Sequence, residues 1–316
     1  MIKKVKALLL AGIITIGVVG CSSTNINKVN DKTKVTLVLS VGGVNDESFN
    51  QGAWEGALKA SEELGVEVSY LESNSDADYI QNIETAIDKE SDLVVGVGFQ
   101  VGEAILEAAK AYPEQSFAAI DSTYEEELDN LRSITFNEEE SGYLTGLIAA
   151  KMTKTNTVGW IGGMPIPSCE GFFWGFEKGA KEVNPDIKVL KQFTNSFTDA
   201  AKGRVVAEQM VNEGADIVFM AAGGGNAGAL EVVRENNIKA IGVDMPNNYL
   251  APEYIITSAL KNVGEGLKLT INDFVNGEFT SGEVKYDLSN GGVGFEKTDL
   301  LSDEIIKYVE DKLNSK

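Results

Sequence analysis

The chain has 316 residues, of which 43% are hydrophobic, and its 48 acidic and 27 basic side chains give a formal net charge of −21 at pH 7. This length suits two domains rather than one small core. The negative charge argues strongly against nucleic acid or another phosphate-rich ligand, because such ligands need cationic side chains. The sequence contains no histidine, which excludes Ser-His-Asp triads, Cys-His dyads and His-ligated zinc.

The N-terminus predicts a lipoprotein signal peptide over residues 1–20. Three lysines among the first six residues precede an apolar run too short for a comfortable transmembrane span. The VVGC junction at Cys21 resembles a lipobox, so we expect diacylation of the thiol and cleavage before it. An ordinary secretory signal with a chance cysteine is the alternative. Residues 21–33 are polar and predict a flexible tether. With Cys21 lipidated, Cys169 has no partner for an intramolecular disulfide.

The segment VGGVNDESFNQGAWEG, residues 41–56, predicts a ligand-binding turn. It follows an apolar, β-branched run over 35–39 that is typical of a buried strand. Ser48 and Gln51 have the spacing of a capping box that begins a helix. The alternative is an ordinary turn with a polar cap and one core aromatic. Four candidate binding residues lie where the strand end meets the helix start, the ligand edge of open parallel sheets: Asn45, Asp46, Phe49 and Asn50.

The segments 92–121 and 216–244 repeat one pattern. Each is a buried strand, a Gly-rich turn, an amphipathic helix and a second strand that ends in aspartate. Strands that alternate with helices predict parallel sheets covered on both faces. The fold class is therefore α/β, with two similar doubly wound parallel-sheet lobes joined by a hinge.

The domain boundaries follow from the repeat. We expect an N-terminal lobe over 34–152 and a C-terminal lobe over 153–257, with a short polar hinge at 153–156. Residues 258–284 should return to the first lobe, and 285–316 to the second. Several crossovers would restrict the lobes to opening and closing around a cleft.

The segment Gly223–Gly228 matches G-x-G-x-x-G, and Asp244 follows some twenty residues on. This pattern alone fits a dinucleotide fingerprint. However, it lies in the second repeat, and the equivalent turn at 96–102 lacks the third glycine at the required spacing. The chain also has the start of a secreted protein. We therefore expect no nicotinamide cofactor and no metal.

Three aspartates, Asp46, Asp121 and Asp244, should project from strand ends into the cleft. Carboxylates accept hydrogen bonds from vicinal hydroxyls, which suggests a sugar or ribose group. Lys261, after a strand, could add one donor. The alternative for each aspartate is a helix or turn cap, and for the lysine, surface decoration. Acidic runs such as 138–140 and 125–127 are most simply solvated faces.

Aromatic side chains flank the same expected cleft. Phe49 and Phe172 begin matching helices in the two lobes, and Phe99 lies in a turn beside them. A flat ring could stack between such side chains. The alternative is that all three belong to the core, which is the interpretation we prefer for Phe173 and Trp174.

Motifs along the mature chain resemble the basic-membrane-protein family of bacterial lipoproteins. They include GGVNDESFNQGAWEG, ITFNEEESGYLTG, TNTVGWIGGMPIP, NSFTDAAKGR, GADIVFMAAGGG and TSALKNV. Members with assigned ligands are largely purine-nucleoside receptors of ABC importers, with a type I periplasmic-binding-protein fold. The resemblance implies a monomeric, non-catalytic receptor, lipid-anchored on the extracytoplasmic face of the cell membrane, that delivers a nucleoside to an ABC permease.

The resemblance also implies roles for the candidate residues. Asn45, Asp46, Phe49 and Asn50 would contact the nucleoside, and Asp121 would read the base edge. Phe49 and Phe172 would sandwich the ring, while Gly224, Asp244 and Lys261 would hold the ribose. Three places depart from the family pattern: Gly171, Ser168–Cys169 and Met245–Tyr249. The rivals are a sugar-binding or sensory lipoprotein of the same fold and a nucleoside hydrolase, which would need clustered carboxylates around a metal.

Overall fold

The computed structural model describes residues 32–313. The expected signal peptide, Cys21 and most of the tether lie outside these residues. The described chain forms two six-stranded sheets. The first contains, in spatial order, β11 (Gly282–Tyr286), β5 (Leu131–Phe136), β4 (Ser116–Ile120), β3 (Leu93–Val97), β1 (Lys34–Leu39) and β2 (Glu67–Leu71), and its neighbouring strands pair in parallel.

The second sheet repeats this order. It contains β12 (Val293–Phe295), β10 (Ile255–Lys261), β9 (Lys239–Asp244), β8 (Ile217–Ala221), β6 (Thr157–Gly162) and β7 (Lys188–Phe193). Its strands are parallel except β12, which pairs antiparallel with β10. The predicted class, two similar parallel-sheet α/β lobes, is confirmed.

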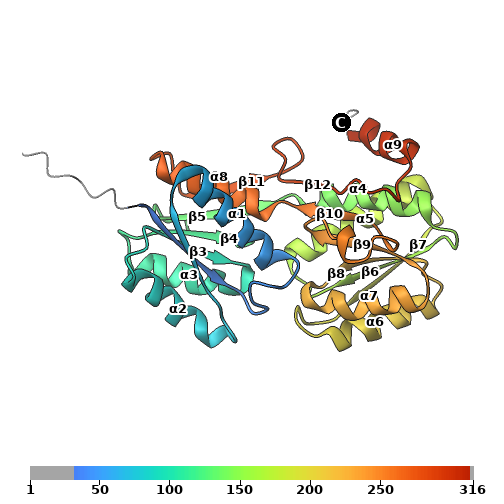
Figure 1. The fold of residues 1–316 in the computed structure, drawn as a ribbon, viewed down its shortest axis with the longest axis horizontal. Coiled ribbons are helices and arrows are strands. Elements are labelled where there is room, and N and C mark those ends of the chain that lie inside the picture. Colours follow the sequence, from blue (N-terminus) through green and yellow to red (C-terminus); the bar gives the residue numbers. More distant parts are fainter. Residues whose placement is uncertain (1–31, 314–316) are drawn as a thin grey trace, which may run out of the picture. The chain divides into compact units, whose positions relative to one another are not determined.

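Helices cover both faces of the first sheet (Figure 1). The helices α1 (Phe49–Leu64) and α8 (Val263–Val275) pack on one face, and α2 (Tyr79–Asp88) and α3 (Phe99–Ala111) on the other. Alternate residues of β1 point to opposite faces of the sheet: Leu37 packs in the core under α1 and α8, and Val38 packs in the core under α2 and α3. This alternation follows from the period of two in a strand.

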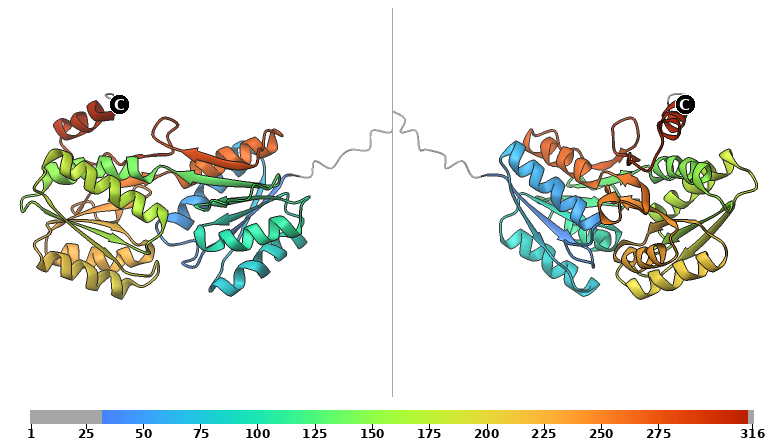
Figure 2. Two further views of the ribbon diagram at one scale, coloured as in Figure 1. Left: turned by 180° about the vertical axis from the view of Figure 1, so that it is seen from behind. Right: turned by 45° about the vertical axis from the view of Figure 1, so that its right-hand side comes forward.

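The second sheet is covered in the same way (Figure 2). The helices α4 (Glu138–Met152), α5 (Pro167–Val183) and α9 (Asp303–Leu313) pack around Trp160, which is fully buried on one face. The helices α6 (Ala200–Asn212) and α7 (Asn226–Glu235) cover Ile161 on the other. Short 3₁₀ turns complete the chain: η1 (Asp76–Asp78), η2 (Gly223–Gly225) and η3 (Asn248–Leu250).

Helix α4 belongs to the core of the second sheet, which differs from our expectation that the first lobe extends to residue 152. Glycines let the backbones of α4 and α5 come close together. A Cβ at Gly142 or Gly146 would lie under 3.0 Å from a carbonyl oxygen of α5, and one at Gly175 under 3.0 Å from the Glu139 carbonyl oxygen. The first lobe therefore ends after β5.

Within the described residues, the chain passes between the sheets at three places. These are Asn137 between β5 and α4, Asn262 between β10 and α8, and 287–292 between β11 and β12. The expected hinge at 153–156 instead joins α4 to β6 inside the second lobe, because α4 has already crossed. The return of α8 and β11 to the first lobe places a helix and an edge strand there.

Candidate functional site

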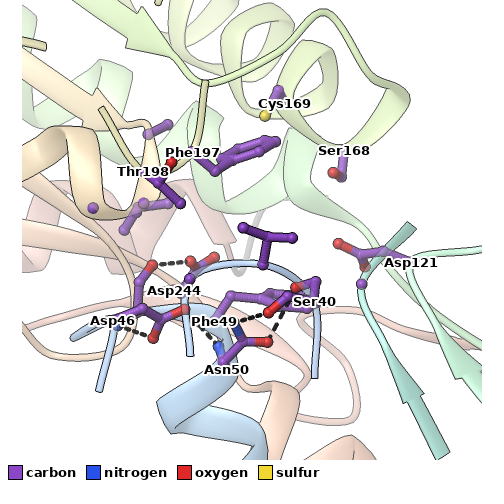
Figure 3. Close-up of a pocket in the computed structure, with 18 of the residues that line it drawn as sticks. Ser40, Asp46, Phe49, Asn50, Asp121, Ser168, Cys169, Phe197, Thr198 and Asp244 are labelled. Atoms are coloured by element: carbon purple, nitrogen blue, oxygen red, sulfur yellow. Dashed lines mark hydrogen bonds between the residues drawn. The ribbon is translucent and has the colours of Figure 1, made fainter. Parts of the chain in front are cut away.

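A cavity of about 300 Å³ lies between the loops that follow the strands of both sheets (Figure 3). This volume is at the lower end of the range of small-molecule sites, about 300–1,000 Å³. The structure brings all ten predicted binding residues to its wall: Asn45, Asp46, Phe49, Asn50, Phe99, Asp121, Phe172, Gly224, Asp244 and Lys261. They converge because the carboxyl ends of parallel strands meet at one edge of each sheet.

Asp46 caps helix α1. Its carboxylate accepts hydrogen bonds from the backbone N–H groups of Ser48 at 3.0 Å, Asn50 at 2.9 Å and Gln51 at 3.1 Å. Burial raises the pKa of Asp46, and these bonds partly oppose that rise. The predicted capping box of Ser48 and Gln51 is wrong, since the Ser48 side chain makes no cap bond. Asp46 satisfies the free N–H groups instead, which leaves the Ser48 hydroxyl available.

The freed hydroxyl links the two lobes. Ser48 Oγ donates a hydrogen bond to Asp244 Oδ2 at the end of β9. Beside it, Asn247 Nδ2 donates to the Glu47 carbonyl oxygen at 3.2 Å. Asn247 is itself fixed, because its Oδ1 accepts from the Val243 N–H at 2.9 Å. The loop before α1 is thus held against the end of β9.

Asp121 and Asp244 occupy equivalent strand ends and share an unusual backbone. Their φ angles are 62° and 66°, in the left-handed region that few residues other than glycine adopt. Such strain tends to gather at ligand sites. Burial raises the pKa of Asp244 to about 6, although Lys261 and the Ser48 hydroxyl both lower it. A part of the Asp244 population is therefore protonated near neutral pH.

Lys261 is the last residue of β10, and it is buried and lines the cavity. Its Nζ contacts Asp121 Oδ2 and lies 2.7 Å from Glu138 Oε1. The Phe49 and Phe136 rings lie 5.2 and 5.3 Å from the same atom. Burial alone would lower the pKa of Lys261, but the carboxylates of Asp121, Glu138 and Asp244 together raise it. Lys261 is therefore a fully charged, fully paired cation.

Sequence reasoning missed two charged residues at the site: Glu47, which lines the cavity, and Glu138, which is buried beside Lys261. The acidic run at 138–140 was expected to be a solvated face, but Glu138 is only 8% exposed. Burial raises its pKa, against the opposing effect of Lys261. The expectation held for 125–127, which is exposed. Its position could have indicated burial near the site, because Glu138 is the first residue of a helix that follows a buried strand.

The aromatic residues divide into cavity walls and core. Figure 3 shows Phe49 and Phe197 on opposite walls, and the Phe197 and Phe99 rings lie 6.3 Å apart. Phe172 lines the cavity but is only 3% exposed, with its ring 5.9 Å from that of Phe219. Phe197 was not among the predicted residues, although its segment NSFTD belongs to the motifs that carry the resemblance.

The two aromatic neighbours of Phe172 differ from each other. Phe173 lies in the core as expected, with its ring 5.5 Å from that of Trp160. Trp174 is 56% exposed, so its assignment to the core was wrong. The reason is helical geometry: the face of α5 that carries Phe172, Phe173 and Phe176 points to the sheet, and Trp174 falls on the opposite face.

The Gly-rich turn does not have the geometry of a pyrophosphate cradle. Gly224 N–H donates to the Phe197 carbonyl oxygen at 2.8 Å, and Gly225 N–H donates to the Ala222 carbonyl oxygen at 3.0 Å. These donors are therefore already used within the protein. Across residues 32–313, no group of three acidic or cysteine side chains could hold a metal ion. In the same range no helix is long and apolar enough to cross a membrane.

Two of the departures from the family pattern contact the site. Cys169 is a buried free thiol on the cavity wall, and burial raises its pKa to about 12. Gly171 packs against Glu138, since a Cβ there would lie 3.3 Å from the Glu138 Cβ. Gly171 thus leaves room for the buried Glu138 side chain. In the third departure, Met245–Tyr249, Asn247 is buried and Tyr249 is 57% exposed.

A cavity between two parallel-sheet lobes, lined by the strand ends of both, is the arrangement found in solute-binding proteins of ABC transporters. Residues 32–316 match the Bmp family model, described as ABC transporter substrate-binding protein PnrA-like, and the chain belongs to this family. The ABC transporter nucleoside-binding protein BmpA of Lactococcus lactis is 35% identical over 99% of this chain and 96% of its own. Basic membrane protein A of Borreliella burgdorferi is 37% identical over 98% and 93%.

Solved structures share the fold of this chain. An ABC transporter solute-binding protein from Aeropyrum pernix K1 is similar with a TM-score of 0.78 and 33% identity, over 89% of this chain and 80% of its own. A protein from Bacillus halodurans described as a transcriptional activator of the comK gene is similar with a TM-score of 0.77 and 26% identity, over 89% and 96%. The chain is thus a substrate-binding protein of the Bmp family.

Proposed function

We propose that this protein captures a purine nucleoside in the inter-lobe cavity and delivers it to a membrane permease. The observation that carries the proposal is the pairing of two chemistries on one small cavity: aromatic faces at Phe49 and Phe197, and carboxylates at Asp121 and Asp244. An aromatic face suits a flat base, and a buried carboxylate suits the two hydroxyls of ribose. The name of the Lactococcus relative supports the same ligand class.

The charges of the cavity favour a neutral ligand over a phosphorylated one. Its charged lining residues are four acids, Asp46, Glu47, Asp121 and Asp244, and one lysine. That lysine already has two carboxylate partners. A nucleotide would bring further negative charge into a site without a free cation, so the nucleoside is the better candidate.

The N-terminal motifs support a place of action at the membrane. The basic, apolar N-terminus and the VVGC junction support tethering through Cys21 to the extracytoplasmic face of the cell membrane. The receptor acts as a monomer that presents its ligand to the permease subunits. A tether of about a dozen residues would let it bind ligand and reach the permease.

Titration calorimetry with guanosine, 2′-deoxyguanosine and ribose tests the ligand. Asp244→Ala should weaken guanosine binding by about tenfold or more, because a charge-assisted hydrogen bond contributes about 1.5–3 kcal/mol. The same variant should weaken deoxyguanosine less. Phe49→Ala should weaken both nucleosides equally, since stacking does not depend on the sugar. Phe172→Ala and Phe197→Ala, measured in parallel, identify the second stacking partner.

The rival functions predict different results. Ribose binding as tight as guanosine binding would favour a sugar receptor and refute the nucleoside assignment. Release of free base from guanosine, in proportion to protein and lost in Asp244→Ala, would favour a hydrolase. We expect guanosine to be recovered intact, because the cavity offers no cluster of acids suited to a metal within the described residues.

A further inference from the structure

Lys261 forms ion pairs with two carboxylates, and these belong to different lobes. Asp121 follows β4 in the first sheet, whereas Lys261 ends β10 in the second. Glu138 is the first residue of α4, whose apolar residues lie in the second core. The Lys261–Asp121 contact therefore crosses the cleft, and the Lys261–Glu138 pair at 2.7 Å does not.

Glu138 is fixed firmly to the second lobe. The neighbouring Gly171 of α5 lies so near that a Cβ there would be 3.3 Å from the Glu138 Cβ and 3.6 Å from its Oε2. One turn further along α4, the Ser141 hydroxyl donates to the Gly294 carbonyl oxygen of β12 at 2.8 Å. Glu138 does not line the ligand cavity. A buried carboxylate placed this way can act on the ligand only through Lys261.

Separation of the lobes would remove Asp121 from Lys261. A buried lysine without a counter-ion is strongly unfavourable, so opening would carry a large penalty if Asp121 were the only partner. Glu138 remains beside Lys261 in either arrangement and reduces that penalty. Asp244, also in the second lobe and also attracted to Lys261, contributes in the same direction from a greater distance.

We propose that Glu138 is a positioning residue that retains Lys261 in the second lobe when the lobes separate, and thereby sets the balance between open and closed forms. The inference deepens the proposed function, because opening admits and releases the ligand. The direction of the shift between open and closed forms distinguishes this role from a purely structural one. Removal of this buried charge should favour the closed form, whereas a residue that merely supports the site would loosen it when removed.

The distance between the lobes, measured without ligand, tests the proposal. Spin labels are attached to the full chain at Leu58→Cys in α1 and Val205→Cys in α6, which are 40% and 51% exposed. Cys21→Ser is present in every variant, and a protein without the two new cysteines shows that buried Cys169 stays unlabelled. Pulsed electron spin resonance then gives the distribution of label separations.

Glu138→Gln should shift this distribution toward the closed form by about threefold or more in population ratio. Asp121→Asn should shift it toward the open form, and Glu138→Asp should restore the wild-type distribution. Glu138→Met provides a second neutral side chain if the glutamine variant loses its circular dichroism. An unchanged or more open distribution in the neutral Glu138 variants overturns the proposal.

A second set of samples with guanosine separates this proposal from the proposed function. Guanosine should close all variants. If guanosine leaves every distribution unchanged while the Glu138 effect persists, the ligand assignment fails and the role of Glu138 stands. If guanosine closes the wild type but Glu138→Gln behaves like the wild type without ligand, the ligand assignment stands and the role of Glu138 fails.

Discussion

Asp244 should lower the stability of the empty protein, so Asp244→Asn should stabilise it even as it removes a ligand contact. The pKa of the Asp244 carboxyl is raised from 3.8 to about 6, with burial as the largest cause. At neutral pH that rise corresponds to about 3 kcal/mol of lost stability, because the ionised form is less favourable in the folded state. Asparagine keeps an oxygen for the Ser48 hydroxyl and carries no charge.

The contribution of Asp244 to the free energy of unfolding depends on pH. Between pH 3.8 and about 6 the folded protein binds a proton at Asp244 more readily than the unfolded chain does. Stability from this group therefore falls as pH rises through that window. The variant should match the wild type near pH 4 and exceed it by up to about 3 kcal/mol at pH 7. The raised pKa values of Asp46 and Glu138 are present in both proteins and largely cancel in the difference.

Urea unfolding without ligand, at half-unit steps from pH 4 to pH 8, measures this difference. Far-UV circular dichroism follows both lobes at once, and equal slopes in the two proteins show that the same surface is exposed. A variant that is less stable than the wild type at pH 7 would contradict the reasoning. It would mean that the ionised carboxylate gains more from Lys261 than it loses by burial.

Four further predictions concern the pH dependence of guanosine binding, Gly146, Gly52 and Cys21. Guanosine affinity should fall as pH is lowered from 7.5 to 5, because protonated Asp244 cannot accept both ribose hydroxyls; calorimetry of Asp244→Asn, whose affinity should not change with pH, is the control. Gly146→Ala should destabilise the protein by about 1–3 kcal/mol, since its Cβ would lie under 3.0 Å from the Phe176 carbonyl oxygen. Gly52→Ala, a helical position with open space, should instead stabilise by about 0.5–1 kcal/mol in the same urea assay. Cys21→Ser should abolish labelling with palmitate and leave unprocessed precursor; labelling that persists would reject the lipobox.

The internal repeat made several residues of the cavity wall predictable. Because each copy ends a parallel strand in aspartate, Asp121 and Asp244 had to reach the edges that face the other lobe. The same logic placed Phe49 and Lys261 on the cavity wall, where the structure has them. The parallel sheets needed no knowledge of distant contacts, since they follow from the alternation of strands and helices along the chain.

The errors arose where tertiary packing decided the outcome. Helix α4 is buried over most of its surface, so its sequence has no polar face to show which sheet it covers. The burial of Glu138 follows from that crossing and from Gly171, neither of which is visible in an acidic run. Ser48 looked like a cap because the spacing allowed it, but Asp46 caps the helix, and the hydroxyl bonds across the cleft instead.

A crystal structure of the protein grown with guanosine would show directly where the nucleoside binds and in which orientation. We expect the base against Phe49 inside the inter-lobe cavity, with the ribose hydroxyls within hydrogen-bond distance of Asp244 and the base edge facing Asp121. An empty cavity under saturating guanosine, or a nucleoside bound elsewhere on the surface, would contradict the account. A reversed ligand, with ribose at Asp121 and base at Asp244, would keep the cavity and contradict the assigned roles.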